Sequence, residues 1–371
     1  MLDTALKLLK VFTSNSYKAY IVGGFVRDYI LGIESNDIDI TTNATPKEIK
    51  EIFKDCCLPN EEYGSVIVIK SGIKFEITTF RKEIEYSNNR KPIEIKYVND
   101  LYTDLLRRDF IINTLCIDEN GKILDFLGGQ DDLKRKIIRC VGDADSKFNE
   151  DCLRIMRAIR FATILDFDLA DDVICAISKN KYLVKDLSFY RKKVELDKIF
   201  SSPNRNKGIK LLIDLGLEKE LDLPNLKEIL DKPVNSSIVV WSILNNDKYP
   251  FNKNESDLIN DINESKKYNN LDPVVLFKYG LYVNSCSASI KGIDIKKITK
   301  SYNDLTIKCR DDIDINSNQI MDVLNMKPGK YLKDIYDDIE KEILYKRLSN
   351  CYDEIVKYIK EKYNLGSDIS E

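Results

Sequence analysis

The sequence contains no histidine among its 371 residues, and its nine cysteines include no Cys-x-x-Cys pair. The missing histidine excludes a Ser-His-Asp triad, a histidine-ligated metal and a histidine/aspartate phosphohydrolase centre. An odd number of scattered cysteines indicates reduced thiols rather than a disulfide framework. Any catalytic metal must therefore be held by carboxylates.

Long apolar runs are also absent, so no segment of the sequence is expected to span a bilayer. The first residues predict an amphipathic helix without the small-residue cleavage site of a signal peptide. With 43% apolar and 32% charged residues, the composition is typical of a soluble globular protein. We therefore expect a cytoplasmic protein that has two or more domains and does not bind membranes.

An excess of positive charge is missing too, because the formal net charge is −3. Binding to nucleic acid would therefore need a local basic face rather than attraction by the whole surface. Basic residues do cluster in the first half of the chain, at Arg81, Lys82, Arg90, Lys91, Lys96, Arg107, Arg108, Lys134, Arg135, Lys136, Arg139, Arg154, Arg157 and Arg160.

Two glycines separate a short apolar run from a helical pattern near the N-terminus. Residues 19–22 predict a buried strand, Gly23 and Gly24 end it, and residues 25–31 have helical periodicity. The glycines would let a triphosphate approach the backbone at a helix N-terminus, where Arg27 also lies. This segment therefore predicts a nucleotide-binding turn.

The next predicted strand carries Asp37 and Asp39, which alternation places on one face. Two carboxylates so close repel each other unless a cation lies between them. Mg²⁺ suits this position because it takes one or two carboxylates together with substrate phosphates. An Asp-x-Asp pair alone is more often a solvated strand face, but the Gly-Gly turn and Arg27 upstream favour a metal site.

This combination resembles the head of the class II tRNA nucleotidyltransferases and bacterial poly(A) polymerases, a branch of the polymerase-beta superfamily. The resemblance implies an α+β fold, with a nucleotidyltransferase head of a small mixed sheet and helices followed by an all-helical neck, body and tail. It also implies that Asp37 and Asp39 hold two Mg²⁺ ions and that Gly23, Gly24 and Arg27 bind the nucleotide. The expected domains are the catalytic head at 1–140, the neck at 141–205, the body at 206–312 and the tail at 313–371.

A hairpin and a loop are expected after the two aspartates. Residues 65–69 and 74–79 predict paired strands, and Glu76 on the second is either a third catalytic carboxylate or a solvated strand residue. Phe80 to Pro92 has no clear periodicity and predicts a long loop. Arg81 and Glu83 at the base of this loop could form ion pairs with residues of the following helical region and so couple the loop's movement to that region.

Residues 105–114 resemble the second motif of the family. They predict a helix opened by Arg107, Arg108 and Asp109. Arg108 is expected to bind the triphosphate, because phosphoryl transfer repeatedly uses such a second arginine. Asp109 is either a helix cap or a site residue.

Residues 150–162 match the family pattern E-D-x-L-R-x-x-R-A-x-R-F-A. On a helix, Asp151 and Arg154 would be neighbours, and we expect this pair to select the base. Arg157 and Arg160 are expected to order the helix and to reach the nucleotide or primer. A salt-bridged surface helix is the alternative, which the upstream motifs disfavour. Residues 187–196 resemble the fifth motif, with Tyr190 where the family usually has an acid.

The expected activity is template-independent addition of CCA to the 3′ end of tRNA from CTP and ATP. The body and tail are expected to bind the acceptor arm and elbow of tRNA, and no obligate protein partner is evident. Alternatives within the enzyme class are a CC-adding enzyme, an A-adding enzyme and a poly(A) polymerase. In the family, CC-only enzymes have a shortened version of the loop at 80–92, and no shortening is visible here. The alternative outside the enzyme class is a catalytically silent RNA-binding protein on the same scaffold.

Overall fold

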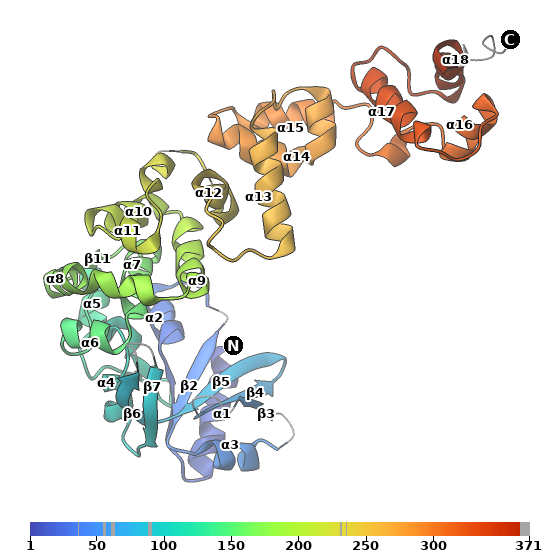
Figure 1. Cartoon of the computed structure of the whole chain (residues 1–371). Coiled ribbons are helices and arrows are strands. Elements are labelled where there is room, and N and C mark those ends of the chain that lie inside the picture. Colours follow the sequence, from blue (N-terminus) through green and yellow to red (C-terminus); the bar gives the residue numbers. More distant parts are fainter. Residues whose placement is uncertain are drawn as a thin grey trace. The chain divides into compact units, whose positions relative to one another are not determined.

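The computed structural model describes residues 1–35, 37–54, 57–60, 64–87, 91–230, 232–234 and 236–363. The chain divides into two compact units (Figure 1). The first consists of residues 1–230 with 248–250, and the second of residues 231–247 with 251–371. The fourfold division into head, neck, body and tail stays a prediction, since its boundary at 205 lies inside the first unit and its boundary at 312 inside the second.

A mixed sheet forms the base of the first unit, with the strand order β3–β4–β5–β2–β1–β8–β9. Strands β2 and β5 pair in parallel, and the other neighbouring strands pair antiparallel. The fold is therefore α+β with a mixed sheet, as predicted. The bounds are β1 Ala19–Val22, β2 Ile38–Thr42, β3 Cys57–Asn60, β4 Ser65–Lys70, β5 Ile73–Thr79, β8 Cys116–Ile117 and β9 Ile123–Leu124.

Local sequence features determine the elements around the Gly-Gly turn. Gly23 has φ +84°, a conformation that side chains disfavour, and helix α2 (Gly24–Leu31) begins directly after it. The helix ends at Gly32, which adopts the left-handed conformation. Thr45 caps helix α3 (Pro46–Ile52) through a capping box with Glu48. The predicted strand at 19–22, the helix that follows it and the hairpin β4–β5 are confirmed.

The predicted loop from Phe80 to Pro92 is wrong. Strands β6 (Arg81–Ser87) and β7 (Lys91–Tyr97) form an antiparallel hairpin that makes its own two-stranded sheet. The register runs from Arg81 opposite Tyr97 to Ser87 opposite Lys91, so backbone hydrogen bonds between the strands order the segment. Residues 88–90, which include the Asn88-Asn89 pair, lie outside the described residues.

The predicted helix opened by Arg107, Arg108 and Asp109 is also wrong. Helix α4 (Leu101–Leu106) begins at the Asp100 cap and ends before Arg108, and a short 3₁₀ turn, η2 (Ile111–Asn113), follows. Between them the backbone pairs with residues 139–141, because the Ile111 amide donates to the Arg139 carbonyl and the Val141 amide donates to the Asp109 carbonyl. This pairing requires an extended segment, which excludes a continuous helix.

Helices form most of the remainder of the first unit. Ile155, Met156 and Ile159 of helix α7 (Leu153–Ile164) are fully buried. Two short strands, β10 (Ile137–Ile138) and β11 (Asp168–Leu169), pair in parallel beside it, so the predicted all-helical neck is wrong in this detail. The bounds are α1 Leu2–Ser14, α5 Gly129–Arg135, α6 Ala144–Glu150, α7 Leu153–Ile164, α8 Asp171–Asn180, η3 Lys181–Asp186, α9 Phe189–Phe200, α10 Arg205–Asp214, α11 Glu218–Leu221 and η4 Leu226–Ile229.

Every regular element in the described part of the second unit is a helix. Helices α17 (Tyr331–Leu344) and α18 (Tyr352–Tyr363) lie near its C-terminal end. Ile339, Ile343 and Ile355 are buried at the centre of that region. In the described part of the chain no helix is both long and apolar enough to cross a membrane. The bounds are α12 Ser237–Leu244, α13 Lys253–Ser265, α14 Pro273–Ile290, α15 Ile295–Asn303, η5 Arg310–Asp312, α16 Ser317–Leu324, α17 Tyr331–Leu344 and α18 Tyr352–Tyr363.

Candidate active site

Three predicted site residues meet at the Gly-Gly turn. A β-carbon built on Gly23 would lie 3.5 Å from Arg108 Nη1 and 3.7 Å from Asp39 Oδ2. The Gly23 amide donates to the Leu115 carbonyl, 3.3 Å away, which fixes the turn against the strand end. The structure thus brings a helix N-terminus, a guanidinium and a carboxylate to one place, where an anion and a cation can both be bound.

The carboxylates lie on the strand next to this turn. Asp39 on β2 is in register with Glu76 on β5, so the two side chains share a face of the parallel pair. Asp37 is exposed and immediately precedes β2, whereas Asp39 lies within it. Asp39 is exposed as a residue, but the surrounding protein partly removes water from its carboxyl group. This desolvation raises the pKa of Asp39. The charge of Arg108 opposes this increase, and the charges of Glu76 and Asp37 add to it.

This donor set fits magnesium rather than a metal that needs a complete protein cage. Among the residues that the structure describes, no group of three or more carboxylate or thiol side chains forms a ready-made metal site. Mg²⁺ is commonly bound by one or two carboxylates and completes its shell with water and substrate phosphates. The crowding of like charges at Asp39 is the electrostatic condition that a bound cation would relieve.

Arg27 lies beneath the turn. Its Nη1 donates to Asn113 Oδ1 at 2.9 Å, and its Nε donates to Asp28 Oδ1 at 2.8 Å. Its guanidinium also lies over the ring of Phe161, 5.1 Å from the ring centroid. Arg27 therefore connects α2 to η2 and α7, and its Nη2 is near Gly24, 3.7 Å from where a β-carbon would be.

Asp109 is not a helix cap but a buried connection to α7. It accepts hydrogen bonds from Arg157 Nε at 2.7 Å, from Asn113 Nδ2 at 3.1 Å and from the Phe110 amide at 2.8 Å. Burial would raise the pKa of Asp109, but the charge of Arg157 and these hydrogen bonds outweigh burial and lower the pKa to about 2. The structure thus favours a structural role for Asp109.

Asp151 does not share a helix with Arg154, so that part of the prediction is wrong. Helix α6 ends at Glu150, Asp151 is extended, and α7 begins at Leu153. Asp151 Oδ1 accepts from the Leu153 amide at 3.0 Å, and its Oδ2 lies 3.6 Å from Arg191 Nη2. Burial raises the pKa of Asp151, and the charge of Arg191 opposes that shift.

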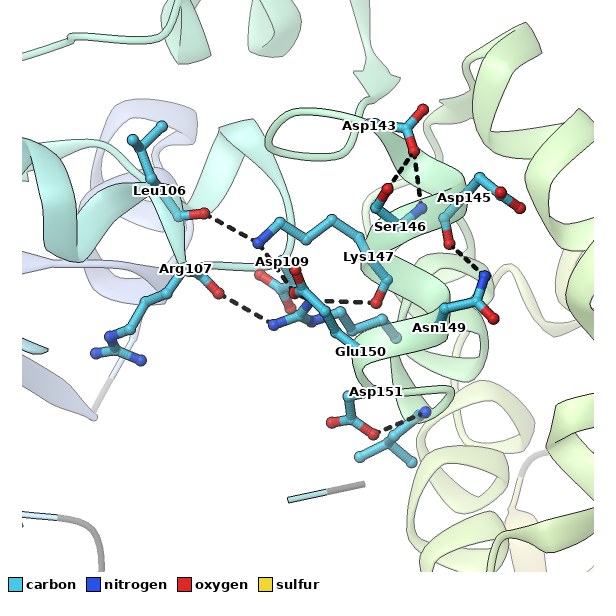
Figure 2. A network of polar contacts seen from close by, with 12 residues as sticks. Leu106, Arg107, Asp109, Asp143, Asp145, Ser146, Lys147, Asn149, Glu150 and Asp151 are labelled. Atoms are coloured by element: carbon cyan, nitrogen blue, oxygen red, sulfur yellow. Dashed lines mark hydrogen bonds and ion pairs between the residues drawn. The ribbon is translucent and has the colours of Figure 1, made fainter. Parts of the chain in front are cut away.

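Arg154 has other partners than the one predicted. Its Nη1 donates to Glu150 and to the Lys147 carbonyl, and its Nη2 donates to the Arg107 carbonyl at 3.1 Å. Lys147 Nζ donates to the neighbouring Leu106 carbonyl at 3.0 Å. Figure 2 shows the Leu106 carbonyl at the end of α4 facing the Lys147 side chain of α6, and the adjacent Arg107 carbonyl accepts from Arg154 of α7. Two cationic side chains that flank Asp151 in sequence, Lys147 and Arg154, therefore donate hydrogen bonds to carbonyls at the C-terminal end of α4.

Two further predicted arginines order α7. Arg157 binds Asp109 and remains partly exposed, while Arg160 is buried and pairs with Glu195 of α9 at 2.9 Å. Burial lowers the pKa of Arg160 to about 10, although Glu195 opposes the shift. The guanidinium groups of Arg157 and Arg160 both lie over the Phe161 ring, at 5.3 and 4.3 Å from its centroid.

One residue of this region was missed by the sequence analysis. Asp104 on α4 is fully buried and contacts Arg107, Arg108, Thr41 and the backbone of Arg81. Its spacing of three and four residues from the two arginines was a signal, because such spacing favours contacts on a helix. The burial of the carboxylate, however, depends on strands far away in the sequence.

Comparisons with known proteins agree with this geometry. A family model described as the poly A polymerase head domain matches residues 19–139. A model described as a probable RNA and SrmB-binding site of polymerase A matches residues 166–230, and one described as a putative tRNA nucleotidyltransferase domain 2 matches residues 252–359. The CCA-adding enzyme of Ligilactobacillus salivarius is 32% identical over 96% of this chain and 96% of its own length.

The chain belongs to the family of CCA-adding enzymes. A solved structure of the Bacillus stearothermophilus CCA-adding enzyme in complex with CTP covers 98% of this chain and 97% of its own, with a TM-score of 0.82 and 27% identity. The Thermotoga maritima CCA-adding enzyme complexed with tRNA has a TM-score of 0.70 and 21% identity, covers 97% of this chain and 95% of its own, and shows the same fold.

Proposed function

We propose that this chain adds CCA to the 3′ end of tRNA from CTP and ATP without a nucleic-acid template. The observation that carries the proposal is the meeting of Gly23, Asp39 and Arg108 at one turn. Relatives named CCA-adding enzymes that align over nearly the whole chain support it.

Asp37 and Asp39 are the residues that would hold two Mg²⁺ ions, with Glu76 as a possible third carboxylate. When bound, the ions lower the pKa of the RNA 3′-hydroxyl and neutralise charge on the triphosphate and its leaving pyrophosphate. The chain's own contribution is to place these carboxylates on the rigid β2–β5 pair, beside the turn that receives the triphosphate.

The triphosphate would be bound by the backbone around Gly23 and Gly24, at the N-terminus of α2, and by Arg108. Arg108 Nη1 already faces the turn. Arg27 supports the same turn from beneath, because its guanidinium is held by Asn113 and Asp28. A helix N-terminus with an adjacent arginine is a suitable binding place for phosphate groups.

Asp151 and Arg154 would select the base. Cytosine and adenine each present an amino donor beside a ring-nitrogen acceptor, so a carboxylate can accept from the first and a guanidinium can donate to the second. Uracil and guanine would place a carbonyl opposite Asp151, which is repulsive and leaves the carboxylate unpaired. Base reading would require Arg154 to exchange some of its present contacts with Glu150 and backbone carbonyls. Arg157 and Arg160 would keep α7 in place, and their contact with the nucleotide or primer stays a prediction.

Replacing Asp151 by alanine is expected to reduce the preference for CTP and ATP over UTP and GTP by about 10- to 100-fold, the discrimination that one well-formed pair of hydrogen bonds provides. The measurement is single-turnover incorporation of each of the four nucleotides. Asp143→Asn is the matched control, because Asp143 caps the other end of α6 and asparagine preserves the cap. Strict selection retained in Asp151→Ala would contradict the assignment.

The body and tail, at 206–312 and 313–371, are proposed to bind the acceptor arm and elbow of tRNA. The comparison that supports this binding is the Thermotoga maritima enzyme, which has the same fold and was solved complexed with tRNA. Binding through phosphates would weaken as salt concentration rises, because counterions are released on association.

The proposed activity is tested with three tRNA transcripts, ending before CCA, after the first C and after CC, each supplied with CTP and ATP. An enzyme that adds the whole CCA completes all three transcripts and then stops. Extension of only the CC-ended transcript would indicate an A-adding enzyme, and arrest after CC would indicate a CC-adding enzyme. Continued addition from ATP would indicate a poly(A) polymerase, and no incorporation would indicate a silent RNA-binding protein.

A further inference from the structure

A single buried carboxylate joins three segments of the first unit: β2, the start of β6 and the end of α4. Asp104 Oδ2 accepts from Thr41 Oγ1 of β2 at 3.2 Å, and its Oδ1 accepts from the Arg81 amide at the start of β6, also at 3.2 Å. Arg107 Nε donates to Oδ1 at 2.8 Å, and Arg108 Nη2 donates to Oδ2 at 3.4 Å. The strand that carries Asp39, the hairpin β6–β7 and the arginine at the Gly-Gly turn therefore share one anchor.

The two arginines are held by Asp104 to different degrees. Charge-assisted hydrogen bonds are usually about 2.7–2.9 Å long, so the Arg107 contact is tight and the Arg108 contact is longer than usual. Arg108 Nε is buried and has no hydrogen-bond acceptor among the described residues. Asp104 thus holds one edge of the Arg108 guanidinium by charge, while Nη1 on the other side points toward Gly23.

Burial of an unpaired carboxylate costs free energy, so a buried Asp104 needs cationic or hydrogen-bonding partners to offset that cost. Burial raises the pKa of Asp104, but the charges of Arg107 and Arg108 and the hydrogen bonds outweigh it, and the net pKa is lowered. Asp104 is therefore an anion at neutral pH, and its negative charge is available to orient Arg108.

We propose that Asp104 is a positioning residue for the nucleotide, which orients Arg108 toward the triphosphate and connects Arg108 to the base of the β6–β7 hairpin. This inference depends on the nucleotidyl-transfer activity proposed above. Asp104 contacts Nη2 of Arg108, whereas Nη1 is the atom near Gly23, so Asp104 would affect the nucleotide only by orienting Arg108. A displacement of the hairpin would change the Arg81 hydrogen bond to Asp104, and Arg108 would shift with the carboxylate.

A double-mutant cycle tests the inference, with Asp104→Asn, Arg108→Gln and the two combined. Arg108→Gln is expected to raise KM for CTP and ATP or to lower kcat by about 100-fold, the effect of removing one preorganised donor. Asp104→Asn is expected to reduce kcat/KM by about 10-fold in the wild-type background and by less than about 2-fold in the Arg108→Gln background, because residues in one network are not additive. Affinity for tRNA should not change in any variant.

Additive losses in the cycle would overturn the inference, because they would show that Asp104 acts independently of Arg108. Asp100→Asn is the matched control: Asp100 is exposed, lies at the N-terminus of the same helix, and its cap is preserved by asparagine. If Asp104→Asn does not fold, Thr41→Val replaces it in the cycle, since valine keeps the shape and removes one hydrogen bond to the carboxylate. A wild-type protein that incorporates no nucleotide would refute the proposed function, whereas an active wild type with an additive cycle would refute only the role of Asp104.

Discussion

Replacing Asp39 by alanine is expected to reduce nucleotide incorporation by at least about 1,000-fold while tRNA binding stays within about 2-fold of wild type. Asp39 lies beside the Gly23 turn and in register with Glu76, so its removal leaves the proposed magnesium site without its central carboxylate. The nucleotide and the tRNA would still be bound by other residues. The measurement pairs single-turnover incorporation of radiolabelled CTP with filter binding of tRNA.

Glu34→Gln serves as the control for this loss, because Glu34 is an exposed acid in the segment that leads to the same strand. Incorporation at a near-normal rate in Asp39→Ala would remove the proposed mechanism. Glu76→Gln, measured in parallel, decides the alternative left open by the sequence. A loss comparable to that of Asp39→Ala would make Glu76 a third catalytic carboxylate, and normal activity would make it a solvated strand residue.

The parts of the fold that were predicted correctly depend on neighbours in the sequence. Gly23 and Gly32 fix the two ends of α2 through backbone conformations that other residues disfavour. Thr45, Pro46 and Glu48 together determine the start of α3. Such local signals also placed Asp39 on a strand, next to a nucleotide-binding turn.

The β6–β7 hairpin was missed because, among the described residues, its strands pair only with each other, and because they carry many charges. In a strand with one buried face, alternation of apolar and polar residues reveals the structure. The sequence does alternate at Glu83, Ile84, Glu85 and Tyr86, and this alternation was the signal that could have identified the strand.

Other misses concern contacts between residues far apart in the sequence. Arg154 donates to the carbonyl of Arg107, and Arg157 binds Asp109, although 47 and 48 residues separate these pairs. Sequence spacing suggested Asp151 as the partner of Arg154, but the end of α6 at Glu150 changes which acid is within reach. Side-chain partners of this kind are determined by tertiary packing, which helical spacing alone does not specify.

Shortening the β6–β7 hairpin is expected to stop the addition of A while C addition continues. The same Asp151 and Arg154 would read both bases, so the pocket must change shape after the second C, and a segment outside it must drive that change. The hairpin is the candidate because its first residue, Arg81, donates to Asp104, which also contacts Arg108. The pairing of β6 with β7 strengthens the case, since paired strands transmit displacement along their length better than a flexible chain.

The experiment deletes residues 87–90 and supplies the variant with transcripts that end before CCA and after CC. We expect C addition within about 3-fold of wild type and A addition reduced by about 100-fold, the size of loss that a misplacement near 1 Å can produce. Replacing the same four residues by glycines keeps the length and controls for the loss of side chains. If the deletion slows C and A addition equally, the hairpin supports the active site as a whole; if A addition proceeds normally, the change of pocket shape must originate elsewhere. A selective loss of A addition that the glycine variant does not share would indicate that the length of the hairpin, rather than its chemistry, determines the switch from C to A.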